Sequence, residues 1–139
     1  MPWSHLSAWA EAASSDKLYL IVRGTLLFDE RELPRVDWQN QQDTPAMTRI
    51  DGYIEGLQLS PRGFIRPFQS GVTLEVACMG PWCAGLISGV EYIAFVENRD
   101  GEMMISTNPC GGNAFGNPTE QMAEDLTRCM RGGACQPDF

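Results

Sequence analysis

Five cysteines are the residues of this chain with the most distinctive chemistry. They all lie in the second half of the 139 residues, and they are Cys78, Cys83, Cys110, Cys129 and Cys135. This density is typical of an oxidising compartment and predicts a disulfide framework. The alternatives are a cytosolic protein with reduced thiols and a zinc site, although neither close pair has the two-residue spacing with which two thiolates grip one zinc ion. The odd count leaves one thiol unpaired, bonded to another molecule, or buried as a small hydrophobe.

Other residue types that drive catalysis are sparse. His5 is the only histidine, and it falls in an expected peripheral helix, where a serine or cysteine nucleophile would have to recruit it. Asp29, Glu30 and Glu32 cluster in one loop but lack the spaced oxygen ligands and glycine turn of a calcium loop, so they are typical of a solvated charge run. We predict no catalytic site, no metal and no cofactor. The alternative is a small exported hydrolase or redox enzyme built around His5 or a cysteine.

Two tryptophans in irregular segments are candidate binding residues. Trp38 lies in residues 29–46, which have no sustained period and many polar groups, and Trp82 lies in an irregular crossover at 79–89. Aromatic side chains in loops are plausible interface anchors. The alternative for each is that it folds back and plugs the end of the sheet.

A local basic and aromatic segment adds three further binding candidates. Arg62, Phe64 and Arg66 lie in residues 61–70, which we interpret as a connector that could contact an acidic partner. The alternative is an extension of a strand with phenylalanines inward and arginines outward. Strict period-two alternation disfavours that alternative, because it would put all of these side chains on one face.

Composition and charge exclude several classes of protein. Apolar residues make up 43% and charged residues 20% of the chain, as in ordinary folded proteins, and the length suits one domain over residues 1–139. No stretch has the 18 to 20 apolar residues that crossing a bilayer needs, so we predict no membrane span. The net charge of -8, from 10 basic and 18 acidic residues, would repel a phosphate backbone, so we expect no nucleic-acid partner.

The opening of the chain lacks the features of a leader peptide. Residues 1–5, Met-Pro-Trp-Ser-His, have neither a basic start nor a continuous apolar segment. We expect that an exported protein with this sequence has already lost its leader, so that the numbering begins near a mature terminus.

The first half of the chain predicts a short helix, a long strand, a loop and a second strand. Ser4 can cap a helix that ends near residues 14–16. Residues 18–28 alternate with period two and place Gly24 midway along the buried face, where it permits a bulge or a sharp bend. Residues 47–59 form the expected second strand.

The second half predicts three more strands. Residues 71–79 alternate in polarity and place Cys78 toward the core. Residues 91–97 and 102–107 form the clearest hairpin, joined through residues 98–101, where a glycine is available for positive φ.

A terminal helix completes the expected order of elements. Asn117 supplies an N-cap before Pro118 at the first helical position, and Gly132 and Gly133 end the helix. The long first strand and the mid-strand glycines favour a closed arrangement over a flat sheet. We therefore predict a mainly β fold: a small five-stranded OB-like barrel with Greek key topology, with the N-terminal short helix and the C-terminal helix packed on it.

A set of short motifs around the expected hairpin resembles a known family. A cysteine precedes a strand of the form G-x-x-Y-hydrophobic, and another cysteine follows the Asp-Gly hairpin. The motifs are Cys83-Ala84-Gly85, Gly89-Val90-Glu91-Tyr92-Ile93-Ala94-Phe95, Asp100-Gly101-Glu102-Met103 and Thr107-Asn108-Pro109-Cys110. This pattern resembles the netrin-like domain of tissue inhibitors of metalloproteinases and their bacterial relatives.

The resemblance implies an OB-like barrel, a secreted setting and a protein-binding role. Animal inhibitors of this family chelate the protease zinc through an amino-terminal cysteine, whereas this chain has no cysteine before Cys78, so that mechanism is not carried over. In those inhibitors the cysteines matching Cys83 and Cys110 bond to the terminal segment, and here we expect them to bond to each other. We predict Cys129–Cys135 as the second disulfide, with Cys78 buried and free.

The predicted function is an exported, disulfide-stabilised protein-binding module that uses the loop at 29–46 and the crossover around Trp82. We expect a secreted or periplasmic location and an unidentified protein partner. A second possibility is a metalloprotease inhibitor that acts through a loop rather than through its amino terminus.

Overall fold

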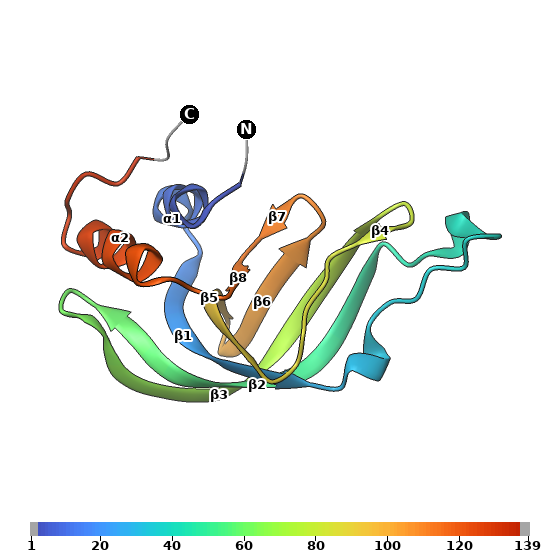
Figure 1. Cartoon of the computed structure of the whole chain (residues 1–139), viewed down its shortest axis with the longest axis horizontal. Coiled ribbons are helices and arrows are strands. Elements are labelled where there is room, and N and C mark those ends of the chain that lie inside the picture. The colour runs from blue at the N-terminus through green and yellow to red at the C-terminus, as the bar shows by residue number, and fades with distance from the viewer. Residues whose placement is uncertain (1–2, 137–139) are drawn as a thin grey trace.

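The computed structural model describes residues 3–136 of the chain, which form a mainly β structure with two helices (Figure 1). In chain order the elements are α1 (His5–Ser14), β1 (Leu18–Phe28), the 3-10 turns η1 (Glu30–Glu32) and η2 (Gln41–Asp43), β2 (Met47–Ser60), β3 (Gly63–Met79), β4 (Trp82–Cys83), β5 (Val90–Arg99), β6 (Glu102–Asn108), β7 (Gly111–Gly112), β8 (Ala114–Gly116) and α2 (Glu120–Met130). In this part of the chain, neither helix is long and apolar enough to cross a membrane.

Five strands form a closed ring of pairings. β1 pairs antiparallel with β2 and β5, β2 with β3, and β5 with β6, while a parallel pairing of β3 with β6 closes the ring. Three short strands pair antiparallel with strands of the ring: β4 with β3, β7 with β6 and β8 with β5. In Figure 1 the long strands β1 to β3 form a curved floor, with α1 and α2 above one end and the β3–β4 and β6–β7 turns toward the other. The mainly β prediction is confirmed.

Two glycines allow β1 and β2 to curve against each other. Gly24 lies opposite Gly56 in the β1–β2 ladder. A Cβ on Gly56 would lie only 2.1 Å from the carbonyl oxygen of Arg23, and a Cβ on Gly24 only 2.5 Å from that of Glu55. Because these are backbone atoms, no side-chain rotation can relieve such overlaps. Strand β1 is curved in Figure 1, its ladder with β2 has no bulge at Gly24, and the close approach there depends on a second glycine across the ladder.

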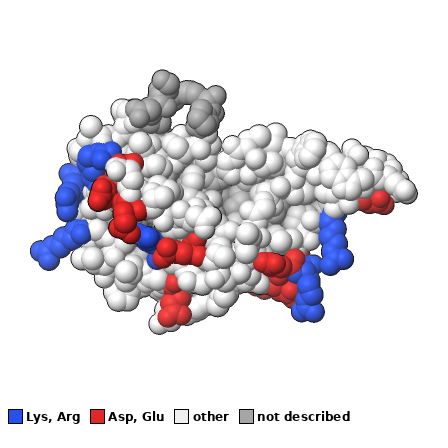
Figure 2. Space-filling view, in the orientation of Figure 1, with Lys and Arg blue, Asp and Glu red and all other residues white. Residues whose placement is uncertain are grey.

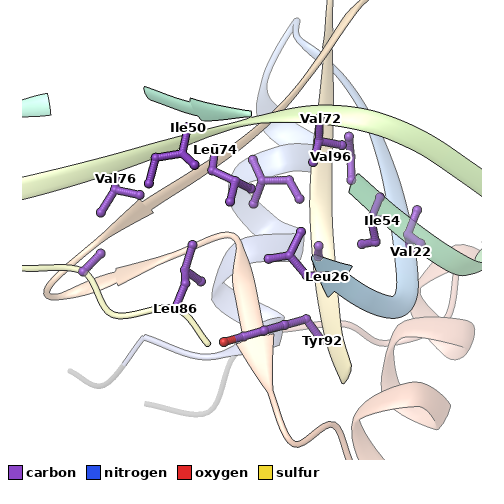
Figure 3. Packing of buried hydrophobic residues seen from close by; sticks show 13 residues of the cluster. Val22, Leu26, Ile50, Ile54, Val72, Leu74, Val76, Leu86, Tyr92 and Val96 are labelled. Carbon is purple, nitrogen blue, oxygen red and sulfur yellow. The ribbon is translucent and has the colours of Figure 1, made fainter. Parts of the chain in front are cut away.

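The core has two parts, one inside the ring and one under the helices. Figure 3 shows the ring interior, where branched aliphatic side chains of β1, β2 and β3 meet those of β5 and Leu86. The second part packs α1 and α2 on the opposite face of β1 and β5, where Phe95 and Leu126 are fully buried. β5 is therefore apolar on both faces, which is why its sequence has no clear alternation.

Strand β3 begins earlier than its sequence predicts. Its first residues pair with β2, so most of the segment 61–70 is strand rather than connector. The register shifts between Gln58 and Leu59, which pair with Arg66 and Phe64, and Ile65 is the extra residue of a β-bulge. The bulge breaks the period-two pattern, so Phe64 packs under the helices while Phe68 packs against the ring interior.

The β5–β6 hairpin is confirmed, and the C-terminal helix begins later than expected. The hairpin turns at Asp100 and Gly101, whose φ angles are 54° and 90°, as a two-residue turn requires. Helix α2 begins at Glu120 rather than at Pro118, because the hydroxyl of Thr119 accepts the N-cap hydrogen bond from the backbone N–H of Met122.

The cysteines pair differently from the expectation. Cys78 is bonded to Cys83, so the predicted Cys83–Cys110 disulfide and the free Cys78 are both wrong. The reason is the tight β3–β4 hairpin, which sets Cys78 directly opposite Cys83. The predicted Cys129–Cys135 disulfide is present, and Cys110 is an exposed free thiol. Two disulfides in so small a chain indicate an oxidising environment.

Candidate functional site

Two exposed tryptophans from separate segments lie in contact at one end of the molecule. The side chains of Trp38 and Trp82 are 58% and 64% exposed, and their ring centroids are 5.7 Å apart in an edge-to-face arrangement. Such a pair contributes about 0.5 to 1.5 kcal/mol beyond its buried area. Neither tryptophan plugs the end of the sheet. The structure thus brings together two binding candidates that are 44 positions apart in the sequence.

The β3–β4 hairpin fixes the position of Trp82. Gly80 adopts a φ of 61° in the turn, and Met79 pairs directly with Trp82 across the hairpin. The Cys78–Cys83 disulfide joins the next pair of this ladder. The hairpin has a tight turn at one end and a disulfide at the other, so the backbone of Trp82 is held rigidly although its ring faces solvent.

Hydrogen bonds near the start of the loop at 29–46 and beside Trp38 fix the position of this residue. The Glu30 carboxylate accepts a hydrogen bond from the backbone N–H of Ser88 at 2.8 Å. Next to Trp38, the Asp37 carboxylate accepts one from the Asn40 side chain at 3.1 Å. That bond, with others from the backbone that follows, lowers the pKa of Asp37 below its usual value. The tryptophan therefore projects from a turn with internal order.

A shallow uncharged hollow adjoins the tryptophan pair. It has a volume of about 490 Å³ and is lined by Met79, Trp82, Cys83, Pro109 and Cys110. In Figure 2 charged side chains gather over the α2 end of the molecule and along the lower right margin, whereas the surface over β4, the β6–β7 turn and the η2 loop is mostly uncharged. We call Trp38, Trp82 and this hollow the tryptophan surface.

The basic and aromatic candidates lie elsewhere. Arg62 lies in the turn before β3, and Phe64 and Arg66 lie near the start of β3, at the opposite end of the strand from Met79; in Figure 1 this end of β3 lies beneath α2. Phe64 packs in the core under the helices, and Arg62 lines a groove of about 420 Å³ that also carries glutamates of α2. The structure therefore does not bring these three residues together with the tryptophans.

His5 links the two helices. Its Nε2 lies 2.8 Å from a carboxylate oxygen of Asp125 on α2, and Gln121 and Arg128 donate to the other oxygen of the same group. Burial raises the pKa of Asp125, but the hydrogen bonds from these three side chains outweigh it and lower the pKa below its usual value. The arrangement holds α1 against α2.

A buried carboxylate that the sequence analysis missed ties the ring together. Glu75 of β3 accepts hydrogen bonds from Arg99 of β5, Arg49 of β2 and Ser106 of β6. The bond from Arg99 is the main reason why the pKa of Glu75 lies below its usual value, against the opposing effect of burial. The network spans four of the five ring strands and lies where β3 and β6 run parallel. No sequence motif marks it, because its members are far apart along the chain.

The loop carboxylates have local partners. Asp29 accepts two hydrogen bonds from the Arg31 guanidinium, and Glu30 accepts one from Ser88. Within residues 3–136 no group of three or more histidine, cysteine, aspartate or glutamate side chains is arranged to hold a metal ion.

Comparisons with known proteins give no relative. No protein-family model, no curated protein and no solved structure was found to match this chain.

Proposed function

We propose that this protein is an exported binding module whose recognition surface is the tryptophan surface. The observation that carries the proposal is that Trp38 and Trp82 come from separate segments, contact each other, and are both more than half exposed. Leaving two large apolar rings in water is unfavourable, and burying them against a partner would recover that free energy. Tryptophans are also the residues most enriched among those that dominate binding energy.

The support beneath the tryptophans suits recognition. Trp82 is fixed by the disulfide-closed hairpin and Trp38 by an internally bonded loop, so little conformational entropy is lost when a partner binds. The uncharged hollow beside them would accept an apolar side chain of the partner. A protein or peptide with an exposed apolar residue fits this surface better than a nucleic acid does, since the chain carries a net charge of -8.

We propose that the ring of five strands is an OB-like barrel of the kind found in netrin-like domains. The strand order β1-β2-β3-β6-β5, returning to β1, and the single parallel pairing of β3 with β6 support this assignment. Helices packed on one side of the ring and the Asp100-Gly101 hairpin are also in keeping with the motifs that suggested the resemblance. The two disulfides support a secreted or periplasmic location.

A loop-mediated metalloprotease inhibitor is the second candidate. The observation that favours it is that the loop at 29–46, which contains η2, projects from the end of the sheet next to β4 (Figure 1). Titrating a panel of metalloproteases with the protein would test this candidate. Inhibition that is lost in Trp38→Ala would support it.

Affinity capture from the native secretome or cell envelope tests the binding proposal. The bait proteins are the wild type, Trp38→Ala, Trp82→Ala and, as a matched control, Leu57→Ala, since Leu57 is 41% exposed on β2 outside the tryptophan surface. We expect one partner to be captured by the wild type and the control but not by either tryptophan variant. A partner captured equally by all four baits would refute the proposed surface.

A further inference from the structure

Two sulfur atoms meet beside the tryptophan pair. The Cys110 thiol donates a hydrogen bond to the thioether sulfur of Met79, with 3.8 Å between the two sulfurs. Both side chains are exposed at the molecular surface. Cys110 is the only free thiol in the described part of the chain, while the other four cysteines are oxidised.

The fold holds the two sulfurs at this separation. Met79 ends strand β3, and Cys110 lies in the two-residue turn between β6 and β7, where the Asn108 side chain accepts a hydrogen bond from the Cys110 backbone N–H. β6 runs parallel to β3, so the end of β6 is carried toward the end of β3. The meeting of the two side chains therefore follows from the ring closure and not from their positions in the sequence.

The geometry suits a cation in place of the shared proton. If each metal–sulfur bond is roughly 2.3 Å long, as for a zinc thiolate, sulfurs 3.8 Å apart enclose an angle of about 110° at the metal. An angle of that size leaves a third coordination position open. Trp82 lines the same hollow, and aromatic rings attract cations that approach their faces.

We propose that Cys110 and Met79 form a binding site for a soft monovalent metal ion, Cu(I). Thiolate and thioether donors select Cu(I), whereas zinc requires four nitrogen, oxygen or thiolate ligands. On binding, the Cys110 S–H bond breaks, the Cu–S bond forms and the proton passes to solvent, so neither sulfur nor copper changes oxidation state. The site lies in the hollow of the tryptophan surface, but its ligands do not include Trp38, so separate variants test the metal site and the binding proposal.

Anaerobic titration with Cu(I) against a chromophoric Cu(I) chelator tests the proposal. The wild type should bind one Cu(I) per chain, and binding should weaken at least tenfold in Cys110→Ser and in Met79→Leu. Met130→Leu is the matched control, because Met130 packs under the helices, and it should bind as the wild type does. Circular dichroism should show Cys110→Ser and Met79→Leu folded, since both side chains are at the surface, and Met130→Leu folded, since leucine and methionine have similar volumes.

Two results would overturn the proposal. The first is a Cu(I) affinity of Met79→Leu equal to that of the wild type, which would mean that the exposed Cys110 thiol alone accounts for the binding. The second is labelling of methionine methyl groups that shows no shift of the Met79 resonance when Cu(I) is added. Trp38→Ala separates the two proposals, because it should abolish partner capture while leaving Cu(I) affinity unchanged.

Discussion

Replacing Gly56 by alanine should destabilise the protein more than any other single-methyl addition in the described strands. The new Cβ would lie 2.1 Å from the carbonyl oxygen of Arg23 and 2.4 Å from the Cα of Gly24. Both are backbone atoms of the neighbouring strand, so β1 and β2 must separate by about 1 Å to accept it, given that such contacts need roughly 3 Å or more. Overpacking costs about 1 to 3 kcal/mol, and we expect an overlap with backbone atoms to cost about 3 kcal/mol.

Urea denaturation measures this cost. For a domain of this size the slope of free energy against urea is about 1.5 to 2 kcal/mol/M, so a loss of about 3 kcal/mol lowers the midpoint by about 1.5 to 2 M. Gly71→Ala is the matched control, because Gly71 also lies in the β2–β3 ladder and the nearest atom to its new Cβ is 3.9 Å away. Its midpoint should change by less than about 0.3 M. Equal midpoints for the two variants would refute the close approach of β1 and β2.

Three further results are expected. The pKa of Glu75 is lowered in the folded protein, so its contribution to stability is present above pH 4.5 and is lost as the pH falls through the folded pKa. Glu75→Gln should lack this pH-dependent contribution. Urea midpoints measured from pH 3 to 7 that fall equally in both proteins would contradict this expectation. Replacing Cys78 and Cys83 together by alanine should cost about 2 kcal/mol, because the bond closes a short loop, and an unchanged midpoint would show that it does not constrain the chain. A double-mutant cycle on Trp38 and Trp82 should give a coupling of about 0.5 to 1.5 kcal/mol, whereas additive effects would mean no contact in solution.

Local patterns in the sequence predicted the elements whose residues interact with near neighbours. The β5–β6 hairpin was predictable because Asp100 and Gly101 supply the two positive φ angles that its turn needs. The sequence marked Gly24 as a position of unusual backbone freedom, but its partner Gly56 was not predictable, because the strand register decides which residues lie opposite.

The errors arose where one extra residue or a distant partner decided the outcome. The first part of β3 was not recognised as a strand, because the bulge at Ile65 reverses the alternation of inward and outward side chains. The Cys78–Cys83 bond had a local signal that was overlooked: four residues between the cysteines, with Gly80 able to form a two-residue turn. The family resemblance predicted a Cys83–Cys110 disulfide instead.

The candidate site was predictable only in part. Each tryptophan could be assigned to an irregular segment, but their contact depends on how the loop at 29–46 folds toward β4, which no local pattern encodes. The meeting of Met79 with Cys110 depends on the parallel pairing of β3 with β6, a long-range contact that sequence periodicity does not show. Glu75 was missed for the same reason, since a glutamate on a strand is usually solvent-facing.

Site-specific photo-crosslinking tests the central claim most directly. A photoreactive amino acid is placed at position 38, at position 82 or, as the control, at position 65, where Ile65 is 53% exposed at the bulge near the other end of β3. After irradiation in the native secretome or envelope, positions 38 and 82 should both crosslink to the same protein, while position 65 should not. Crosslinks to that protein from position 65 alone would contradict the assignment of the tryptophan surface as the binding site.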